Sequence, residues 1–426
     1  MTKPADKTLK RSLNQLETLA MAFGAMVGWG WVALAGGWVG AAGIGGSVSA
    51  FIVGGVMMIV IGLTYAELAS AMPLVGGEHV YSHRALGAGW AFVCTWSIAL
   101  AYISVSAFEA VALPTVLAQL IPAINAHKLW SVAGYDVYLN WVLVGIAASV
   151  AVTWVNIMGI KTAAKMQLLV TLILLLAGAL LLTGASLNPQ TNPMPALFKN
   201  DLSGFLWVLS VVPFLFVGFD VIPQMAEEIN LPQRKIGLLI IVAVLMAIAW
   251  YSLICLAVGL ALPASQLATV ELAPAAAASS VWGTPLAGQG ILLAGIAGIF
   301  TSWNAFLVGG SRAIYVMAKA GQLPAALGWL HPKYNTPANA ILLIGALCCL
   351  APFFGRTMLV WLVDAGSFSV VIAYGLVALS FLVLRAREPD MPRPYRVYGG
   401  RLIVTLCHRS GLPVPARWQR CISLAL

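Results

Sequence analysis

The chain has 426 residues, of which 61% are hydrophobic and 9% are charged, and its formal net charge is +9. Soluble domains carry about 25% charged residues, so this composition excludes a soluble globular protein and predicts a chain that the lipid bilayer surrounds. The basic residues are scattered through the predicted connections and form no stripe, which gives no indication of a nucleic-acid partner.

Ten apolar stretches are predicted to cross the membrane, because about 20 such residues are long enough to span a bilayer. Basic residues favour the cytoplasmic side, and all but three of the 23 lysines and arginines lie on the side of the N-terminus. The three exceptions are Lys128, Lys199 and Arg356. We therefore expect a multi-pass protein of the cell inner (plasma) membrane with a cytoplasmic N-terminus. The predicted spans are 16–40, 47–72, 88–120, 139–158, 165–186, 202–225, 236–262, 287–316, 338–354 and 357–384.

The ten spans divide into two sets of five, and because five is odd the second set would enter the membrane from the opposite face. The predicted fold class is an all-α integral membrane protein with a five-plus-five inverted repeat. Residues 1–15 form a cytoplasmic N-terminal segment, 16–186 the first repeat and 202–384 the second. Residues 385–426 are basic and rich in proline, and we expect them to be a cytoplasmic tail that is disordered or lies on the surface.

Two of the predicted spans are interrupted, and they hold corresponding positions in the two halves. The first contains the sequence GAMVGWGWVALAGG, and the sixth contains Pro213, Gly218 and Pro223. Glycine is flexible and proline lacks an amide donor, so neither stretch is a good continuous helix. Non-helical backbone at membrane depth survives only where it lines a cavity or meets a ligand. Matched interruptions of this kind indicate the substrate site of a secondary transporter.

Four segments resemble the amino acid–polyamine–organocation (APC) permeases: GAMVGWGWV, residues 65–87, residues 213–237 and residues 311–340. The resemblance implies a permease that moves an amino acid or small amine by alternating access, without a cofactor. The family usually has twelve spans, and here the last two are missing. The C-terminal 26 residues look unrelated to the family, as in a truncated or frame-shifted reading.

The resemblance also implies that the substrate binds between spans 1 and 6. Its carboxylate would meet the amides of Gly28, Trp29 and Gly30, at the positive end of a helix dipole. Its ammonium would meet carbonyl oxygens that the interruptions free, in residues 22–25 and 214–217. Trp29 departs from the small residue usual in the family, so its ring would either narrow the pocket or turn outward. The candidate substrate-binding residues are Ala25, Met26, Gly28, Trp29, Gly30, Glu109, Phe214, Phe216, Gly218 and Trp303.

Two acidic residues inside the predicted spans are candidates for proton coupling, Asp220 and Glu109. A charge at the centre of a span costs about 2.5–3.5 kcal/mol, so such residues are functional candidates by default. A proton-coupled subgroup of the family has a lysine in the fifth span, where this chain has Leu174. Thr301 and Ser302 could serve a sodium ion, but hydroxyls in spans more often bond their own backbone. We expect proton symport first and exchange second, with sodium less favoured.

Arg84, Glu227 and Glu228 are candidates for an inner gate, with a solvated charge cluster as the alternative. His79 and His83 stand four residues apart beside a glutamate, but this set lacks a further strong ligand, so we expect no metal site. The chain has neither GxSxG nor HExxH, so we expect no enzyme. The open alternatives are an amine or polyamine porter or exchanger of the same fold, and a sensor or inactive truncated remnant. The sequence leaves the oligomeric state open.

Overall fold

The structure is a computed structural model, and it describes residues 9, 11–189, 196–199, 202–267, 270, 272–355 and 357–397. These residues are almost entirely helical, with one antiparallel two-stranded hairpin. Among them, seven helices are long and apolar enough to cross a membrane.

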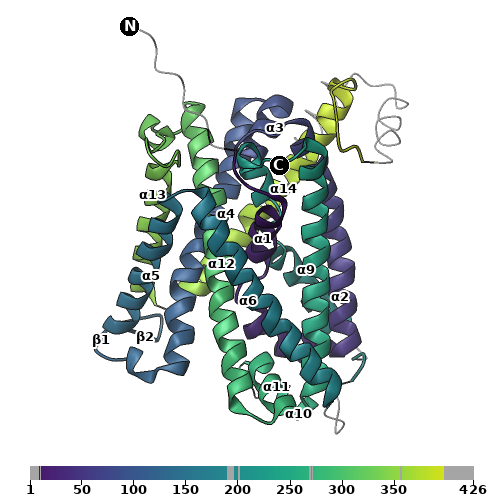
Figure 1. Ribbon diagram of the computed structural model, residues 1–426, viewed down its shortest axis with the longest axis vertical. Coiled ribbons are helices and arrows are strands. Elements are labelled where there is room, and N and C mark those ends of the chain that lie inside the picture. Colours follow the sequence, from purple (N-terminus) through teal and green to yellow (C-terminus); the bar gives the residue numbers. More distant parts are fainter. Residues whose placement is uncertain are drawn as a thin grey trace.

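The helices and strands follow one another along the chain in a simple order (Figure 1). The α-helices are α1 (Gln15–Met26), α2 (Gly30–Ala71), α3 (Gly77–Leu86), α4 (Ala88–Leu120), α5 (Leu139–Ile157), α6 (Ile160–Leu187), α7 (Leu202–Leu215), α8 (Val221–Gln224), α9 (Gln233–Ala261), α10 (Ala264–Leu267), α11 (Ala273–Trp282), α12 (Pro285–Lys319), α13 (Ala338–Leu350) and α14 (Thr357–Arg387). The short elements are the 3₁₀ helices η1 (Pro122–Ile124), η2 (Ala226–Glu228), η3 (Ala325–Gly328) and η4 (Ala351–Phe354), and the strands β1 (Lys128–Val132) and β2 (Tyr135–Tyr138).

The predicted first and second spans meet in α2, which is one run of 42 residues with a kink at Gly43. Gly43 has a φ of +79°, which glycine adopts without strain, and a Cβ atom there would lie 2.4 Å from the carbonyl oxygen of Ala196. The stretch 202–225 is divided between α7 and α8, as its proline and glycine predict. Both α7 and α13 are apolar but shorter than the seven long helices.

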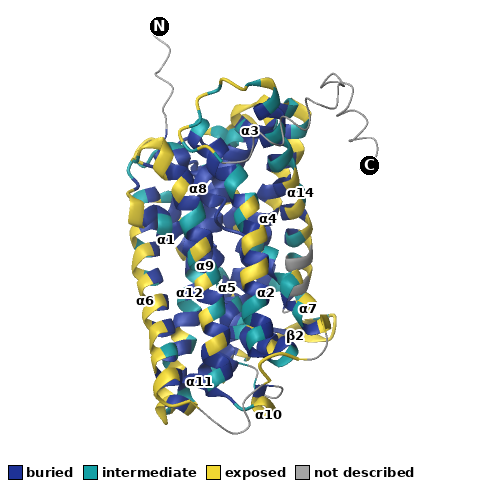
Figure 2. Cartoon of the chain, turned by 90° about the vertical axis from the view of Figure 1, so that its right-hand side faces the viewer, coloured by how far each residue is buried: buried dark blue, intermediate teal, exposed yellow. Residues whose placement is uncertain are grey.

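The helices run largely along the long axis of the molecule (Figures 1 and 2). We name the end that carries α3 the α3 end, and the opposite end, which carries β1 and β2, the hairpin end. Buried residues fill the interior, whereas the outer face of α6 exposes leucines such as Leu169 and Leu176, each 62% exposed. A row of exposed leucines suits contact with lipid.

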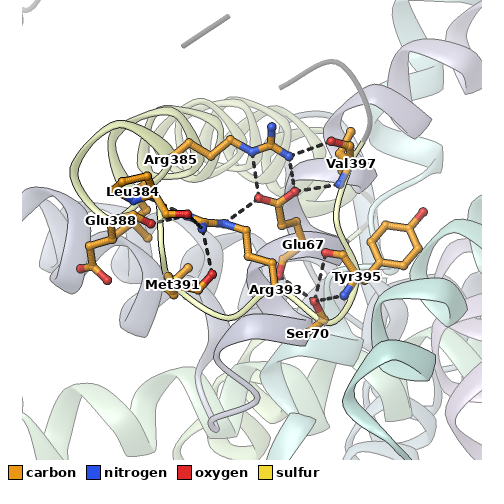
Figure 3. A network of polar contacts seen from close by, with 10 residues as sticks. Glu67, Ser70, Leu384, Arg385, Glu388, Met391, Arg393, Tyr395 and Val397 are labelled. Carbon is orange, nitrogen blue, oxygen red and sulfur yellow. Dashed lines mark hydrogen bonds and ion pairs between the residues drawn. The ribbon is translucent and has the colours of Figure 1, made fainter. Parts of the chain in front are cut away.

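At the α3 end, the segment after α14 folds back onto α2 (Figure 3). Glu67 of α2 is fully buried and forms ion pairs with Arg385 and Arg393. Its carboxylate also accepts a hydrogen bond from the backbone amide of Val397, at 2.8 Å. The predicted tail 385–426 therefore packs against the bundle over its first residues, and the part from 398 onwards lies outside the described residues.

Candidate functional site

The two predicted interruptions lie against each other inside the bundle. The first separates the end of α1 at Met26 from the start of α2, and the second separates α7 from α8. Gly218, in the second interruption, has a φ of +136°. A Cβ atom there would lie 2.6 Å from the Cβ of Ala25 and 2.8 Å from the amide nitrogen of Met26. The close approach of the two segments therefore requires glycine at this position.

A cavity of about 510 Å³ lies beside the two interruptions. Its wall is mostly apolar and comes from α1, α2, α4, α7, α9, α12 and α14. On α4 the wall runs from Val105 to Val116, and on α7 it begins at Ser210, so the cavity extends from the interruptions towards the hairpin end. Seven of the candidate binding residues line it: Ala25, Met26, Gly28, Trp29, Gly30, Glu109 and Phe214.

Glu109 is the acidic side chain of the cavity wall. It is 3% exposed, and its Oε1 accepts a hydrogen bond from the hydroxyl of Ser302 on α12. Its Oε2 has no hydrogen-bond partner among the described residues. A Cβ atom at Gly28 would lie 2.9 Å from the Ser302 hydroxyl and 3.2 Å from Glu109 Oε1. The carboxylate and the interrupted backbone of the first span therefore share one wall of the cavity.

Trp29 is buried in the wall of the cavity, with 8% of its surface exposed. Its ring packs on Gly295 of α12, where a Cβ atom would lie 2.3 Å from the ring. Trp29 is also the residue before α2, and its side chain forms no cap on that helix. The first turn of α2 therefore presents its uncapped N-terminus, beginning at Gly30, to the cavity.

Three candidate binding residues lie outside the cavity wall. Phe216 is fully buried, and its ring centroid lies 5.7 Å from that of Tyr251. Trp303 is also fully buried, 6.5 Å from the ring of Phe300. Gly218 serves the contact between the two interruptions described above.

Asp220 does not line the cavity, because its fully buried carboxylate is enclosed by hydrogen-bond donors. Tyr102 of α4 donates to Oδ2, and Tyr374 of α14 donates to Oδ1 at 3.2 Å. The amide of Gly218 also donates to Oδ1, at 2.8 Å. Asp220 thus connects the second interruption to α4 and α14.

The candidate gate residues lie in separate contacts at the α3 end. Arg84 pairs with Glu388, with Nε 2.9 Å from Oε1. Glu228 pairs with Arg312 through two hydrogen bonds, of 2.9 Å and 3.1 Å, and both side chains are 1% exposed. Glu227 lies beside Glu228 in η2. The structure therefore does not join Arg84 to either glutamate.

Sequence reasoning missed a buried amide network near α1. The side-chain amide of Gln167 donates to the carbonyl oxygens of Ala20 and Thr301, at 3.2 Å and 3.0 Å. Its oxygen accepts from Asn304, at 2.8 Å. Thr301, a candidate sodium ligand, donates to the carbonyl of Gly298 in its own helix. A glutamine inside the apolar stretch MQLLV was the available signal. No group of three metal-binding side chains occurs among the described residues.

A family model described as amino acid permease matches residues 13–411. The chain belongs to this family. The match confirms the resemblance to APC permeases that its motifs indicated.

Several relatives of this permease are transporters. It is 26% identical over 400 residues to the branched-chain amino acid permease BcaP of Bacillus subtilis, a match that covers 92% of this chain and 85% of the relative. It is 24% identical over 397 residues to the methylthioribose transporter of the same organism, with the same coverage. It is 27% identical over 350 residues to the vacuolar cationic amino acid transporter 4 of Arabidopsis thaliana, covering 80% of this chain and 57% of the relative.

The permease also shares its fold with a transporter of known structure. Mhp1, a nucleobase-cation-symport-1 family transporter solved in a closed conformation with bromovinylhydantoin bound, superposes with a TM-score of 0.57 at 16% identity. The match covers 85% of this chain and 78% of Mhp1. The seven apolar helices and the family together make this chain a multi-pass membrane transporter.

Proposed function

We propose that this permease moves an amino acid or a small amine across the inner membrane by alternating access, coupled to protons. The observation that carries the proposal is the cavity beside the two interruptions. Glu109 provides an unpaired carboxylate oxygen in its wall. An unpaired charge in an apolar wall is costly, and a substrate ammonium would compensate it.

The cavity offers complementary groups to both ends of a zwitterion. The uncapped N-terminus of α2, beginning at Gly30, suits a carboxylate because its amides and its dipole both favour an anion. Glu109 Oε2 suits the ammonium. The rings of Phe108 and Phe214 line the same cavity and suit an apolar side chain. This combination fits a neutral amino acid of the kind that BcaP is named for.

An amine without a carboxylate is the second candidate substrate. Glu109 alone would hold its ammonium, and the packing of Trp29 on Gly295 leaves the ring beside the amides that a carboxylate would need. The two candidates therefore differ in their use of the start of α2.

Alternating access is supported by the asymmetry between the two ends of the molecule. The cavity extends towards the hairpin end, and the α3 end holds the buried pairs Arg312–Glu228 and Arg385–Glu67. We take the α3 end as cytoplasmic, so the cavity would extend towards the outer side of the membrane. The ten spans would move as two inverted sets of five.

Proton coupling would use the carboxylates along one side of the site. Glu109 can exchange protons with the cavity, and Asp220 lies deeper, enclosed by Tyr102 and Tyr374. Glu109 and Tyr102 are seven residues apart on α4, so they lie on one helix face. We propose that a proton enters at Glu109 and moves on to Asp220.

Uptake into proteoliposomes tests the proposal. Labelled neutral, cationic and acidic amino acids and small amines are screened with an inward proton gradient. We expect accumulation of a neutral amino acid or an amine, and at least a tenfold loss in Glu109→Gln. Thr115→Val, which changes another polar residue of the wall, is the matched control and should keep uptake within about threefold. Uptake by Glu109→Gln at the wild-type level and with the wild-type pH dependence would contradict the role of Glu109.

A further inference from the structure

Six acidic side chains of the described residues are buried, and they fall into two groups. Glu17, Glu67 and Glu228 each form an ion pair with a lysine or arginine. The other three have no cationic partner among the described residues: Glu78, Glu109 and Asp220. A buried carboxylate without a counter-ion is costly when it is charged, so such a group tends to bind a proton. The proposed function already uses Glu109 and Asp220, and it leaves Glu78 without a role.

Glu78 lies in the first turn of α3 and is fully buried. Its Oε2 accepts a hydrogen bond from the side-chain amide of Gln224 in α8. Its Oε1 has no partner among the described residues. The backbone joins the same two elements, since the amide of Gly76 donates to the carbonyl of Gln224 at 3.2 Å. Glu78 therefore lies at the contact between α3 and the second interrupted span.

Buried tyrosines lie close to both Glu78 and Asp220. Gln224 follows Asp220 by four residues, which is one turn along α8. Tyr374 donates to Asp220, and its ring lies 5.7 Å from that of Tyr65. The hydroxyl of Tyr65 has no hydrogen-bond partner among the described residues, and its electrostatic neighbours include both carboxylates.

Several titratable groups surround Glu78 in the described part of the chain. Among the described residues, no lysine or arginine forms an ion pair with it. The titratable groups that face it are Tyr65 on α2, Tyr81 on α3, Cys94 and Tyr102 on α4, Asp220, and Tyr374 on α14. The hydroxyl of Tyr81 also lacks a partner among the described residues. Neutral hydroxyls can pass a proton between two carboxylates without holding a charge themselves.

We propose that Glu78 is a proton-binding residue of this transporter, placed between Asp220 and the α3 end. In the step that we infer, an O–H bond of protonated Asp220 breaks and an O–H bond forms at Oε1 of Glu78, with buried tyrosine hydroxyls as carriers. Asp220 is left as a carboxylate that three donors stabilise. Glu78 then releases the proton towards the α3 end. The transport role of this residue rests on the proposed function.

Infrared difference spectroscopy of the full-length protein in lipid tests proton binding without a substrate. A protonated carboxylic acid has its own carbonyl-stretch band, and titration of the wild type should show bands that change with pH. In Glu78→Gln one of these bands should be lost, while the side-chain amide keeps a hydrogen-bonding group opposite Gln224. Glu78→Asp should keep the band at a shifted position. A Glu78→Gln spectrum with every wild-type band would overturn the proposal.

Transport measurements then distinguish a proton-binding role of Glu78 from a purely structural one. Gln224→Met is the matched control, because it removes the side-chain hydrogen bond between α3 and α8 and keeps the carboxylate. We expect Glu78→Gln to keep substrate counterflow within about threefold and to lose substrate-driven proton uptake at least tenfold. Gln224→Met should keep both. Equal loss of proton uptake in the two variants would assign Glu78 a structural role and overturn the proposal.

The two proposals can fail separately. If the wild type accumulates no amino acid or amine, the proposed function fails, and the infrared titration still decides whether Glu78 binds a proton. If the wild type accumulates substrate without proton uptake, proton coupling fails and the transport role of Glu78 is overturned with it. If Glu78→Gln does not fold, Glu78→Asp provides the spectroscopic comparison.

Discussion

Gly218 lies directly against Met26, so the second interruption is in contact with the last residue of α1. A Cβ atom at Gly218 would be 2.8 Å from the amide nitrogen of Met26. Tyr251 of α9 holds the same segment, since its hydroxyl donates to the carbonyl of Met26 at 2.7 Å. The position of the end of α1 beside the cavity therefore depends on contacts to the Met26 backbone and on the absence of a side chain at Gly218.

Gly218→Ala should lower the thermal stability of the protein strongly. The new methyl group would meet Ala25 and Met26. The residue would also have to keep a φ of +136°, a backbone angle that residues with a side chain rarely adopt. Gly321→Ala is the control, because Gly321 also has a positive φ, of +75°, but open space around it. Strain of this kind costs about 1–3 kcal/mol. The melting temperature in detergent should fall further in Gly218→Ala than in Gly321→Ala, and equal shifts would contradict a role for the contact.

Gly28→Leu and Gly30→Leu should abolish substrate binding while the protein still inserts and folds. A Cβ atom at Gly28 would lie 2.9 Å from the Ser302 hydroxyl and 3.2 Å from Glu109 Oε1, so a leucine there would displace both side chains. A side chain at Gly30 would meet Leu215, whose Cδ2 lies 3.1 Å from the Cβ position. Gly40→Leu, on the helix α2 that begins at Gly30, is the control, because no atom lies within 4 Å of its Cβ position. Calorimetric affinity for the transported substrate provides the measurement. Affinity within twofold of the wild type in either variant would rule out binding at this interruption.

The interruptions could be predicted from sequence because they depend on residue types with a direct backbone effect. The glycines of the first span and Gly218 of the sixth mark the ends of α1 and α7 to within a few residues. Glu109 could be singled out because a carboxylate inside an apolar stretch is conspicuous. These inferences need only local sequence.

The partners of those residues could not be predicted in the same way. Glu67 pairs with Arg385 and Arg393, which follow it by more than three hundred residues, and nothing in the local pattern of either segment indicates the pairing. The sequence places Asp220 two residues after Gly218 and so predicts that it lies near the interruption. Its enclosure by Tyr102 and Tyr374 arises from the packing of α4 and α14, which the local sequence does not indicate. Long-range packing decides which acidic residue meets the cavity.

Arg385→Met should destabilise the protein far more than Arg84→Met. Arg385 and Glu67 are 7% and 0% exposed, and breaking a buried pair from one side costs about 3–5 kcal/mol when it leaves a charge uncompensated. Glu67 would keep its pair with Arg393, so we expect Arg385→Met to cost part of that amount. Arg84 and Glu388 are 48% and 32% exposed, and such a surface pair contributes about 0–1 kcal/mol. Melting temperatures in detergent compare the two variants. Similar shifts would show that the buried pair between Arg385 of α14 and Glu67 of α2 does not stabilise the protein.

Removal of residues 402–426 should leave uptake essentially intact. Among the described residues, the ion pairs and hydrogen bonds that join Glu67 of α2 to α14 and the segment after it come from residues 385–397, so this truncation keeps them. Uptake into proteoliposomes, normalised to the amount of inserted protein, gives the comparison with the full chain. A truncated protein that is monodisperse in detergent yet inactive would contradict the prediction.

Acidification should destabilise the protein partly through His79 of α3. Burial, and then the neighbouring His83, lower the pKa of His79 from 6.5 to about 4. Between these values the unfolded chain binds a proton that the folded chain does not, so stability is lost as pH falls below about 6.5. His79→Gln can still bond Thr95 and should show a smaller fall in melting temperature between pH 7 and pH 5. His83→Gln removes the smaller cause of the shift and should reduce this fall less than His79→Gln does. An equal fall in the wild type and His79→Gln would contradict the prediction.

Asp220→Asn should remove the pH dependence of uptake while the protein keeps its fold. Asparagine keeps the size of the side chain, and its oxygen can still accept from the amide of Gly218. Its nitrogen would face Tyr102, whose hydroxyl can rotate to accept a hydrogen bond instead of donating one. We therefore expect the variant to fold and to keep measurable substrate exchange. Because asparagine cannot bind the proton, uptake should no longer rise as the external pH falls from neutral towards about 5.

The alternative is that Asp220 serves only to hold the interrupted backbone. In that case Asp220→Asn would express poorly and lose binding at every pH, because the contacts to Tyr102, Tyr374 and Gly218 would all be weakened. Uptake measured against pH for the wild type and the variant, with melting temperature as a check on folding, distinguishes the two roles. An unchanged pH dependence in a well-folded variant would remove Asp220 from the proton pathway. Glu109, which lines the cavity, would then be the group to which the external proton binds.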